Sequence, residues 1–103
     1  MTEIELRFTP ANNDLLARGL KHATVRRSRH GRPGDTFRAG GWTWQVESVD
    51  PMTLGAAADT VYPLCGLPSR EAYLQAWVEQ YGLSEPDLGQ RVYVHRFARV
   101  LSA

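Results

Sequence analysis

The stretch "GLKHATVRRSRHG", residues 19–31, joins the end of one element to the start of the next. Gly19 follows a segment with helical spacing of leucines, and a glycine is typical of a helix end. The next residues alternate, so that Ala23 and Val25 face one side of a strand. The other side of this strand then carries the polar residues His22, Thr24 and Arg26. The sequence therefore predicts a helix that leads into a strand with one polar face, followed by a basic loop.

Two elements are expected before this stretch. Apolar residues alternate with charged ones over residues 4–8, which is the period of a half-buried strand. Thr9 is a possible helix N-cap and Pro10 suits the first helical position. We expect a strand over 4–8 and a short helix from Pro10 to Gly19.

A hairpin is expected after the basic loop. Strand-like residues surround Gly40 and Gly41, and Trp42, Trp44 and Val46, with Ser48 as a further candidate, share one face of the second strand. Pro51 is expected to end that strand, because proline cannot donate to a sheet. Residues 52–64 are compatible with either a short helix or a loop.

The last third predicts a helix and a closing strand. Ser69 can cap a helix that ends at Gly82, and the apolar stripe on this helix is more typical of a core than of a stacking platform. The stripe consists of Tyr73, Leu74, Trp77, Val78 and Tyr81. Residues 91–101 alternate as a strand, in which His95 is expected to be a hydrogen-bonded core residue.

Length and composition limit the possible classes. The 103 residues and 43% apolar content suit one domain, residues 1–103, with a single core. Cys65 is the only cysteine, so no intramolecular disulfide or structural zinc site is expected. No signal peptide, membrane span or cofactor motif is visible, which favours a cytoplasmic protein without cofactors. The expected fold class is α+β, a small mixed β-barrel with two or three flanking helices.

Basic residues are concentrated although the net charge is only +1. Seven of the twelve Lys and Arg residues lie from Arg18 to Arg38, where Asp35 is the only acid and is expected to be a turn residue. Such a block can bind phosphates, or it can simply keep a loop solvated. Charge alone leaves both interpretations open.

Several motifs in order resemble one family. The stretches "LLARGLKHATVR", "PGD", the Trp-rich hairpin, "CGLPSREAYLQAW" and "VYVHRF" resemble the ASCH domain of the PUA-like superfamily of small β-barrels, over nearly the whole chain. The resemblance implies a cleft for RNA or a modified nucleoside. Small bacterial members include amidohydrolases that deacetylate acetylcytidine with a Lys, a Thr and a Glu. Lys21 and Thr24 match the first two, Arg26 matches an accompanying arginine, and Cys65 stands where the glutamate is expected.

The chemistry shows what this replacement changes. A threonine hydroxyl needs a base, and Lys21 could serve only if its pKa is lowered enough to leave it neutral. A carboxylate would orient the substrate amine or protonate the leaving group, which a neutral Cys65 thiol cannot do. Cys65 could itself be the nucleophile if basic neighbours depress its pKa. Glu71 and Asp59 are possible substitutes for the missing acid.

Three functions remain, in order of preference. The first is an RNA- or nucleotide-binding domain with a basic cleft rimmed by Lys21, Arg26, Arg27, Arg29 and Arg32. The second is an amidohydrolase with Thr24 as nucleophile, Lys21 as base, and Arg26 and His22 contacting the substrate. The third is a ribonuclease in which Lys21 or His22 assists attack by a ribose 2′-hydroxyl. The alternative for the two central residues is structural: Lys21 could cap helix carbonyls, and Thr24 is a natural strand residue.

Overall fold

The structure is a computed structural model that describes residues 2–101. Over this range the chain forms three α-helices, one 3-10 helix and four strands. In chain order they are α1 (Pro10–Ala17), β1 (Ala23–Arg26), β2 (Thr36–Ala39), β3 (Trp42–Thr53), α2 (Leu54–Thr60), the 3-10 helix η1 (Tyr62–Cys65), α3 (Arg70–Tyr81) and β4 (Arg91–Arg99).

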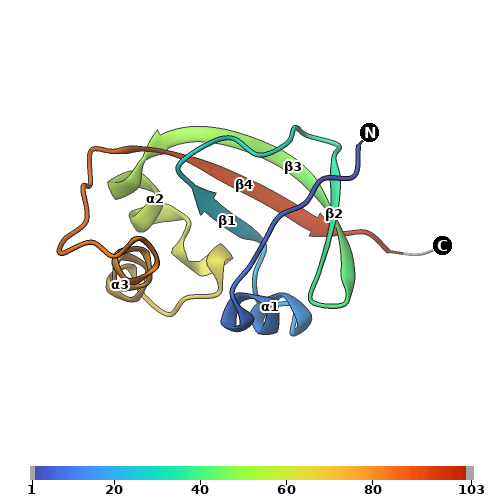
Figure 1. Ribbon diagram of the computed structural model, residues 1–103, viewed down its shortest axis with the longest axis horizontal. Coiled ribbons are helices and arrows are strands. Elements are labelled where there is room, and N and C mark those ends of the chain that lie inside the picture. The colour runs from blue at the N-terminus through green and yellow to red at the C-terminus, as the bar shows by residue number, and fades with distance from the viewer. Residues whose placement is uncertain (1, 102–103) are drawn as a thin grey trace.

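The four strands form one curled sheet in the order β1-β4-β3-β2. Figure 1 shows β3 and β4 arching above β1, with the helices below the arch and the β2–β3 hairpin at the end away from α3. The predicted α+β class with a small barrel and flanking helices is confirmed. All three strand pairings are antiparallel, so the parallel part of the expected mixed sheet is reduced, among residues 2–101, to one bridge between Glu3 and Thr36.

The strand predicted over residues 4–8 does not form. The Ile4 N–H donates to the Thr36 carbonyl, but the segment then leaves the sheet, and the Arg7 carbonyl accepts from the Arg26 guanidinium instead of from a neighbouring strand. The alternation of buried and exposed residues is nevertheless present, because Leu6 is buried between exposed neighbours. Periodicity reports which side chains face the core and does not report whether the backbone finds a strand partner.

Pro51 does not end its strand, contrary to the expectation. β3 runs on to Thr53 and pairs Pro51 opposite Tyr93 of β4. The partner on the other edge, β2, stops where Thr36 pairs with Gln45, so β3 is an edge strand at Pro51 and tolerates the missing donor. An irregularity between Val46 and Ser48 also shifts the register, which buries Val49 rather than Ser48.

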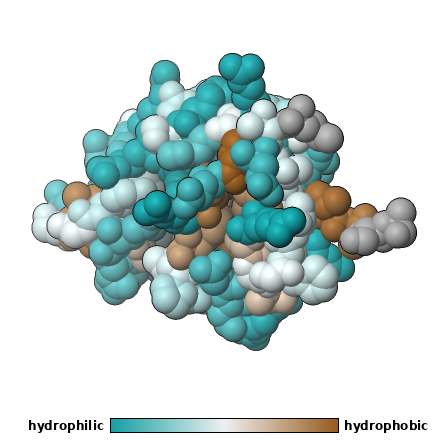
Figure 2. Space-filling model, turned by 45° about the vertical axis from the view of Figure 1, so that its right-hand side comes forward, coloured by the Kyte–Doolittle hydropathy of each residue, from teal (hydrophilic) through white to brown (hydrophobic). Residues whose placement is uncertain are grey.

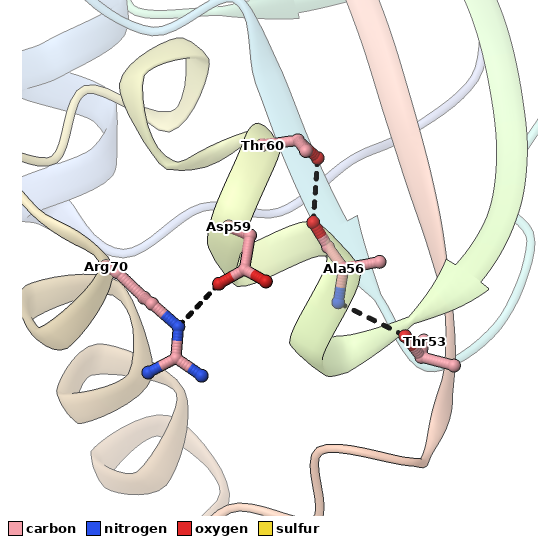
Figure 3. A network of polar contacts seen from close by, with 5 residues as sticks. All are labelled: Thr53, Ala56, Asp59, Thr60 and Arg70. Atoms are coloured by element: carbon pink, nitrogen blue, oxygen red, sulfur yellow. Dashed lines mark hydrogen bonds and ion pairs between the residues drawn. The ribbon is translucent and has the colours of Figure 1, made fainter.

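Residues 52–64, which the sequence left open, form α2 and η1. The Thr53 hydroxyl accepts from the Ala56 N–H and caps α2 (Figure 3). Asp59 on α2 pairs with the Arg70 guanidinium of α3 across 2.6 Å, and the Thr60 hydroxyl donates to the Ala56 carbonyl. The ion pair links the two helices on the exposed side of the molecule.

The helix predicted over 69–82 is confirmed. The Ser69 hydroxyl accepts from the Ala72 N–H, and Gly82 ends α3 with a φ of 63°. Tyr73 and Trp77 face the core, as the apolar stripe predicts. This helix is fixed by local signals, a cap at each end and one apolar face.

The sheet is buried on both faces along β4. Val92 and Val94 belong to an apolar cluster under α2 and α3, whereas Phe97 belongs to a second cluster that includes Leu16 of α1 and Trp44 of β3. The view in Figure 2 is mostly hydrophilic, with apolar surface near the centre and at the left and right edges. None of the helices in residues 2–101 has the length and apolar character needed to cross a bilayer.

Candidate functional site

A pocket of about 70 Å³ lies between the start of β1, the end of η1 and the buried face of α3. Its wall combines apolar and polar side chains and contains no Asp or Glu. The lining residues are Asn12, Lys21, Thr24, Val25, Cys65, Leu67, Tyr73, Ala76, Trp77 and Gln80.

Lys21 is the only lysine in the chain, and only 4% of it is exposed. It follows the turn in which the Leu20 N–H donates to the Leu15 carbonyl, and the His22 N–H donates to the Leu64 carbonyl of η1. Within residues 2–101 the Lys21 ammonium makes no hydrogen bond and no ion pair, so it does not cap the helix. Burial lowers the pKa of Lys21, Cys65 opposes this shift, and the positive charge of Arg26 adds to it.

Thr24 is the second residue of β1, where it pairs with His95 of β4. It is buried and lines the pocket together with Lys21. Its hydroxyl makes no hydrogen bond to Lys21 or to any other residue of the described range. The pair therefore shares one pocket without the nucleophile–base hydrogen bond of an assembled dyad.

Cys65 ends η1 and is 3% exposed. Burial raises the pKa of its thiol, and the nearby Lys21 only partly opposes that shift. This direction is opposite to the one that a thiolate nucleophile requires. Cys65 is thus a neutral group beside a buried lysine.

Tyr73 and Trp77 bring two buried donors to the pocket. The Tyr73 hydroxyl and the Trp77 indole N–H have no hydrogen-bond partner in the described part of the chain. Burial is the main cause that raises the pKa of Tyr73, so the hydroxyl keeps its proton. The apolar stripe predicts that both rings lie in the core, but it does not identify their polar atoms, since helical spacing shows which face a residue occupies and not whether its N–H or O–H is paired.

The proposed substitutes for the missing acid lie elsewhere. Asp59 is held by Arg70, and Glu71 is exposed in the first turn of α3. Neither lines the pocket. His22, predicted to contact substrate, is also exposed and outside the pocket, and its Nε2 lies 2.9 Å from the Gly19 carbonyl. Of the predicted site residues, only Lys21, Thr24 and Cys65 meet in the pocket.

Arg26 does not line the pocket and instead contacts the N-terminal segment. One guanidinium nitrogen donates to the Arg7 carbonyl over 2.7 Å, and the guanidinium carbon lies 5.1 Å from the centre of the Phe8 ring. Burial lowers the pKa of Arg26, and Tyr81 opposes the shift. Arg26 therefore anchors the N-terminal segment as well as adding charge near the pocket.

The remaining basic residues predicted to bind nucleic acid are exposed on the loop after β1. The guanidinium of Arg27 lies 4.0 Å from the Tyr81 ring centre, and that of Arg29 lies 5.4 Å from the Tyr93 ring centre. Arg32 is exposed. The Asp35 carboxylate accepts from the main-chain N–H of Arg32, which confirms Asp35 as a turn residue.

The basic loop and the pocket are neighbours. Tyr81, under the Arg27 guanidinium, has its ring centre 4.6 Å from that of Trp77, and Trp77 lines the pocket. Over residues 2–101, no group of three His, Cys, Asp or Glu side chains is placed to hold a metal ion.

Solved structures share this arrangement of elements. The ASCH domain from Lactobacillus crispatus matches with a TM-score of 0.59 and 13% identity, over 95% of this chain and 77% of that chain. The chain has the ASCH-domain fold. The hypothetical protein PH0355 matches with a TM-score of 0.66 and 16% identity, over 96% of this chain and 98% of that one.

A third structure covers the whole length. Protein PF0455 from Pyrococcus furiosus matches with a TM-score of 0.62 and 15% identity, over 99% of this chain and 100% of that chain. No protein-family model and no curated protein matches the sequence. At these identities the similarity concerns the fold, and the function has to be argued from the site.

Proposed function

We propose that this ASCH-fold protein binds single-stranded RNA or a nucleotide through the loop arginines beside the pocket. The proposal rests on the lack of ion-pair partners for the arginines of this loop. Within residues 2–101, the four arginines of residues 26–32 have no carboxylate partner and lie within seven positions of one another, whereas four other arginines are ion-paired: Arg7, Arg18, Arg38 and Arg70. The other arginines without an ion pair in this range are Arg91, Arg96 and Arg99 of β4. Unpaired guanidinium groups are available for phosphate oxygens.

The aromatic rings below these arginines support the same function. Tyr81 and Tyr93 hold the guanidinium groups of Arg27 and Arg29 over their faces, which limits the motion of both side chains. A guanidinium that is already ordered loses less entropy when it binds a phosphate. The planes of arginine guanidinium groups are also surfaces on which unpaired bases stack.

A salt titration tests the proposal. Binding of a fluorescein-labelled single-stranded RNA is measured by anisotropy at several salt concentrations, for wild type and for the double variant Arg27→Gln/Arg29→Gln. If both arginines contact phosphates, the slope of log affinity against log salt falls by about 0.7 for each lost contact. The control is Arg18→Gln/Arg38→Gln, which removes the same charge from ion-paired sites. Equal slopes in the two double variants would contradict the proposal.

A second candidate, the deacetylation of acetylcytidine, is favoured by the shared pocket of Lys21 and Thr24. In this reaction a neutral Lys21 removes the Thr24 proton, the oxygen attacks the acetyl carbon, and the C–N bond breaks as the amine takes up a proton. Water then hydrolyses the acetyl ester to acetate and restores Thr24. Chromatography after incubation with acetylcytidine tests it, because Thr24→Ala should abolish any cytidine formed by the wild type.

A further inference from the structure

We propose that the pocket beneath the basic loop is a binding site for a small monocarboxylate, whose oxygens accept hydrogen bonds from Lys21, Tyr73 and Trp77. This site goes beyond RNA binding and does not depend on it. It assigns a ligand class to a pocket lined by three donor-bearing residues from two separate segments, Lys21 before β1 and Tyr73 and Trp77 on α3.

The pocket lining contains buried donors that have no acceptor in residues 2–101. An ammonium and an indole N–H can only donate, and the Tyr73 hydroxyl has no acceptor either. All three residues are at least nine-tenths buried: Lys21 is 4%, Trp77 4% and Tyr73 5% exposed. Buried polar groups without a partner are rare and costly in folded proteins. A ligand with acceptor oxygens would give a partner to the Tyr73 hydroxyl and the Trp77 N–H, which are buried without one, and could also accept from the Lys21 ammonium.

The charge of the pocket lining favours a negatively charged ligand. The pocket contains the only lysine of the chain and no acidic residue, and the nearby arginines Arg26 and Arg27 have no carboxylate partner in residues 2–101. A buried cation is normally paired or coordinated, since its desolvation is otherwise uncompensated. An anionic ligand in this pocket would be attracted to the Lys21 ammonium and would meet no acidic side chain there.

The size and shape of the pocket limit which anions can enter it. A cavity of about 150 Å³ holds one benzene ring, so a pocket of about 70 Å³ has room for a group the size of an acetyl or propionyl chain, and a nucleobase attached to such a group would stay outside it. It suits a planar carboxylate with a short hydrocarbon stem. Apolar walls for such a stem are present at Val25, Leu67 and Ala76. These walls favour a carboxylate over phosphate, which has no apolar part to bury.

The three tryptophans of the chain provide the readout. The Trp42 indole N–H donates to the Ala17 carbonyl, and that of Trp44 donates to the Ala39 carbonyl. Trp77 alone among the three has an unpaired indole N–H. In a ¹H–¹⁵N spectrum its indole resonance should move downfield when an acceptor binds, while the other two serve as internal controls.

The experiment titrates the full chain with sodium propionate, with the neutral isostere propionamide, and with phosphate. We expect saturable movement of the Trp77 indole resonance with propionate, and at least tenfold weaker binding of propionamide and of phosphate. Lys21→Met should weaken propionate binding at least tenfold, whereas Arg38→Met, an exposed and ion-paired control, should leave it unchanged.

Each other outcome overturns the proposal. Equal binding of propionate and propionamide would show a neutral acceptor site. Tighter binding of phosphate would show a site for phosphate groups, and no movement of the Trp77 resonance at high propionate would show that the donors are satisfied by water. The wild-type comparison needs no variant, so it decides the question even if Lys21→Met does not fold. Loss of RNA binding in the loop variants would leave these results unaffected.

Discussion

The main-chain N–H of His30 donates to Nε2 of His95 over 2.9 Å, joining the basic loop to the centre of β4. Because Nε2 accepts this bond, the ring proton must be on Nδ1, which lies 3.1 Å from the Tyr93 carbonyl and donates to it. His95 is fully buried, as the sequence predicts for a hydrogen-bonded core histidine. Neutral His95 therefore holds the loop that carries Arg27 and Arg29 in place.

This bond makes stability depend on pH. Burial is the main cause that lowers the pKa of His95 to about 4, from an ordinary value of 6.5, and nearby His30 and Arg26 lower it further. The unfolded chain thus binds the proton more readily between these two values. We expect the contribution of neutral His95 to be complete above pH 6.5 and to be lost as the pH falls toward 4. Urea unfolding at pH 7, 6, 5 and 4.5 should show losses of up to about 1.4 kcal/mol per pH unit.

His95→Gln is the control for that series. A glutamine carbonyl can still accept from the His30 N–H, but it does not titrate. The slope of unfolding free energy against pH should become shallower in this window, with a smaller remainder from His30, whose pKa burial also lowers. A variant with the wild-type slope would assign the pH dependence to other groups.

The parts of the fold that the sequence predicts correctly are those decided by neighbouring residues. The caps Thr9 and Ser69 and the terminal Gly82 act within one turn of their helices, so α1 and α3 can be placed without knowing the rest of the molecule. Whether residues 4–8 pair, or whether Pro51 is tolerated, depends on which strand lies alongside. That information is tertiary and does not appear in the local pattern.

The same distinction applies to the site. Lys21 and Thr24 are three residues apart, and the resemblance added Cys65 to them; the structure places all three in one pocket, although the roles predicted for them stay predictions. The donors Tyr73 and Trp77 could not be identified, because the absence of an acceptor around a buried N–H or O–H is a property of the whole packing. The ion pair between Asp59 and Arg70 could not be predicted either, because it depends on how α2 packs beside α3.

Replacing Lys21 tests whether its buried ammonium lowers the stability of the folded protein. Lys21→Met keeps an unbranched chain of similar length and removes a buried, unpaired cation. We expect a gain of about 1 kcal/mol or more in unfolding free energy, or about 4–8 °C in Tm for a domain of this size. Thermal unfolding at pH 7 in a buffer without carboxylates measures it. A loss of stability would mean that the ammonium is paired in solution.

Removing the hydroxyl of Tyr73 on α3 tests whether this unpaired group also lowers stability. Tyr73→Phe keeps the ring in the core and deletes an O–H that has no partner in residues 2–101. Because an unsatisfied buried group costs about 1–3 kcal/mol, the variant should be at least as stable as the wild type and up to about that much more stable. Tyr81→Phe, on the half-buried side of the same helix, provides the comparison. A clear loss of stability in Tyr73→Phe alone would reveal a partner for the hydroxyl.

Placing a carboxylate at position 65 tests whether the absence of an acidic side chain from the pocket lining limits binding or catalysis. Cys65→Glu would place an acid beside Lys21, in a pocket with about 70 Å³ of space for the longer side chain. An internal carboxylate should compete with an external one, so the propionate-induced shift of the Trp77 resonance should be lost. If the pocket supports deacetylation, the same variant should hydrolyse acetylcytidine faster than the wild type, by on the order of a hundredfold to ten-thousandfold. Cys65→Gln, equal in size but uncharged, should do neither. Equal behaviour of the Glu and Gln variants in both assays would show that charge at this position controls neither binding nor catalysis.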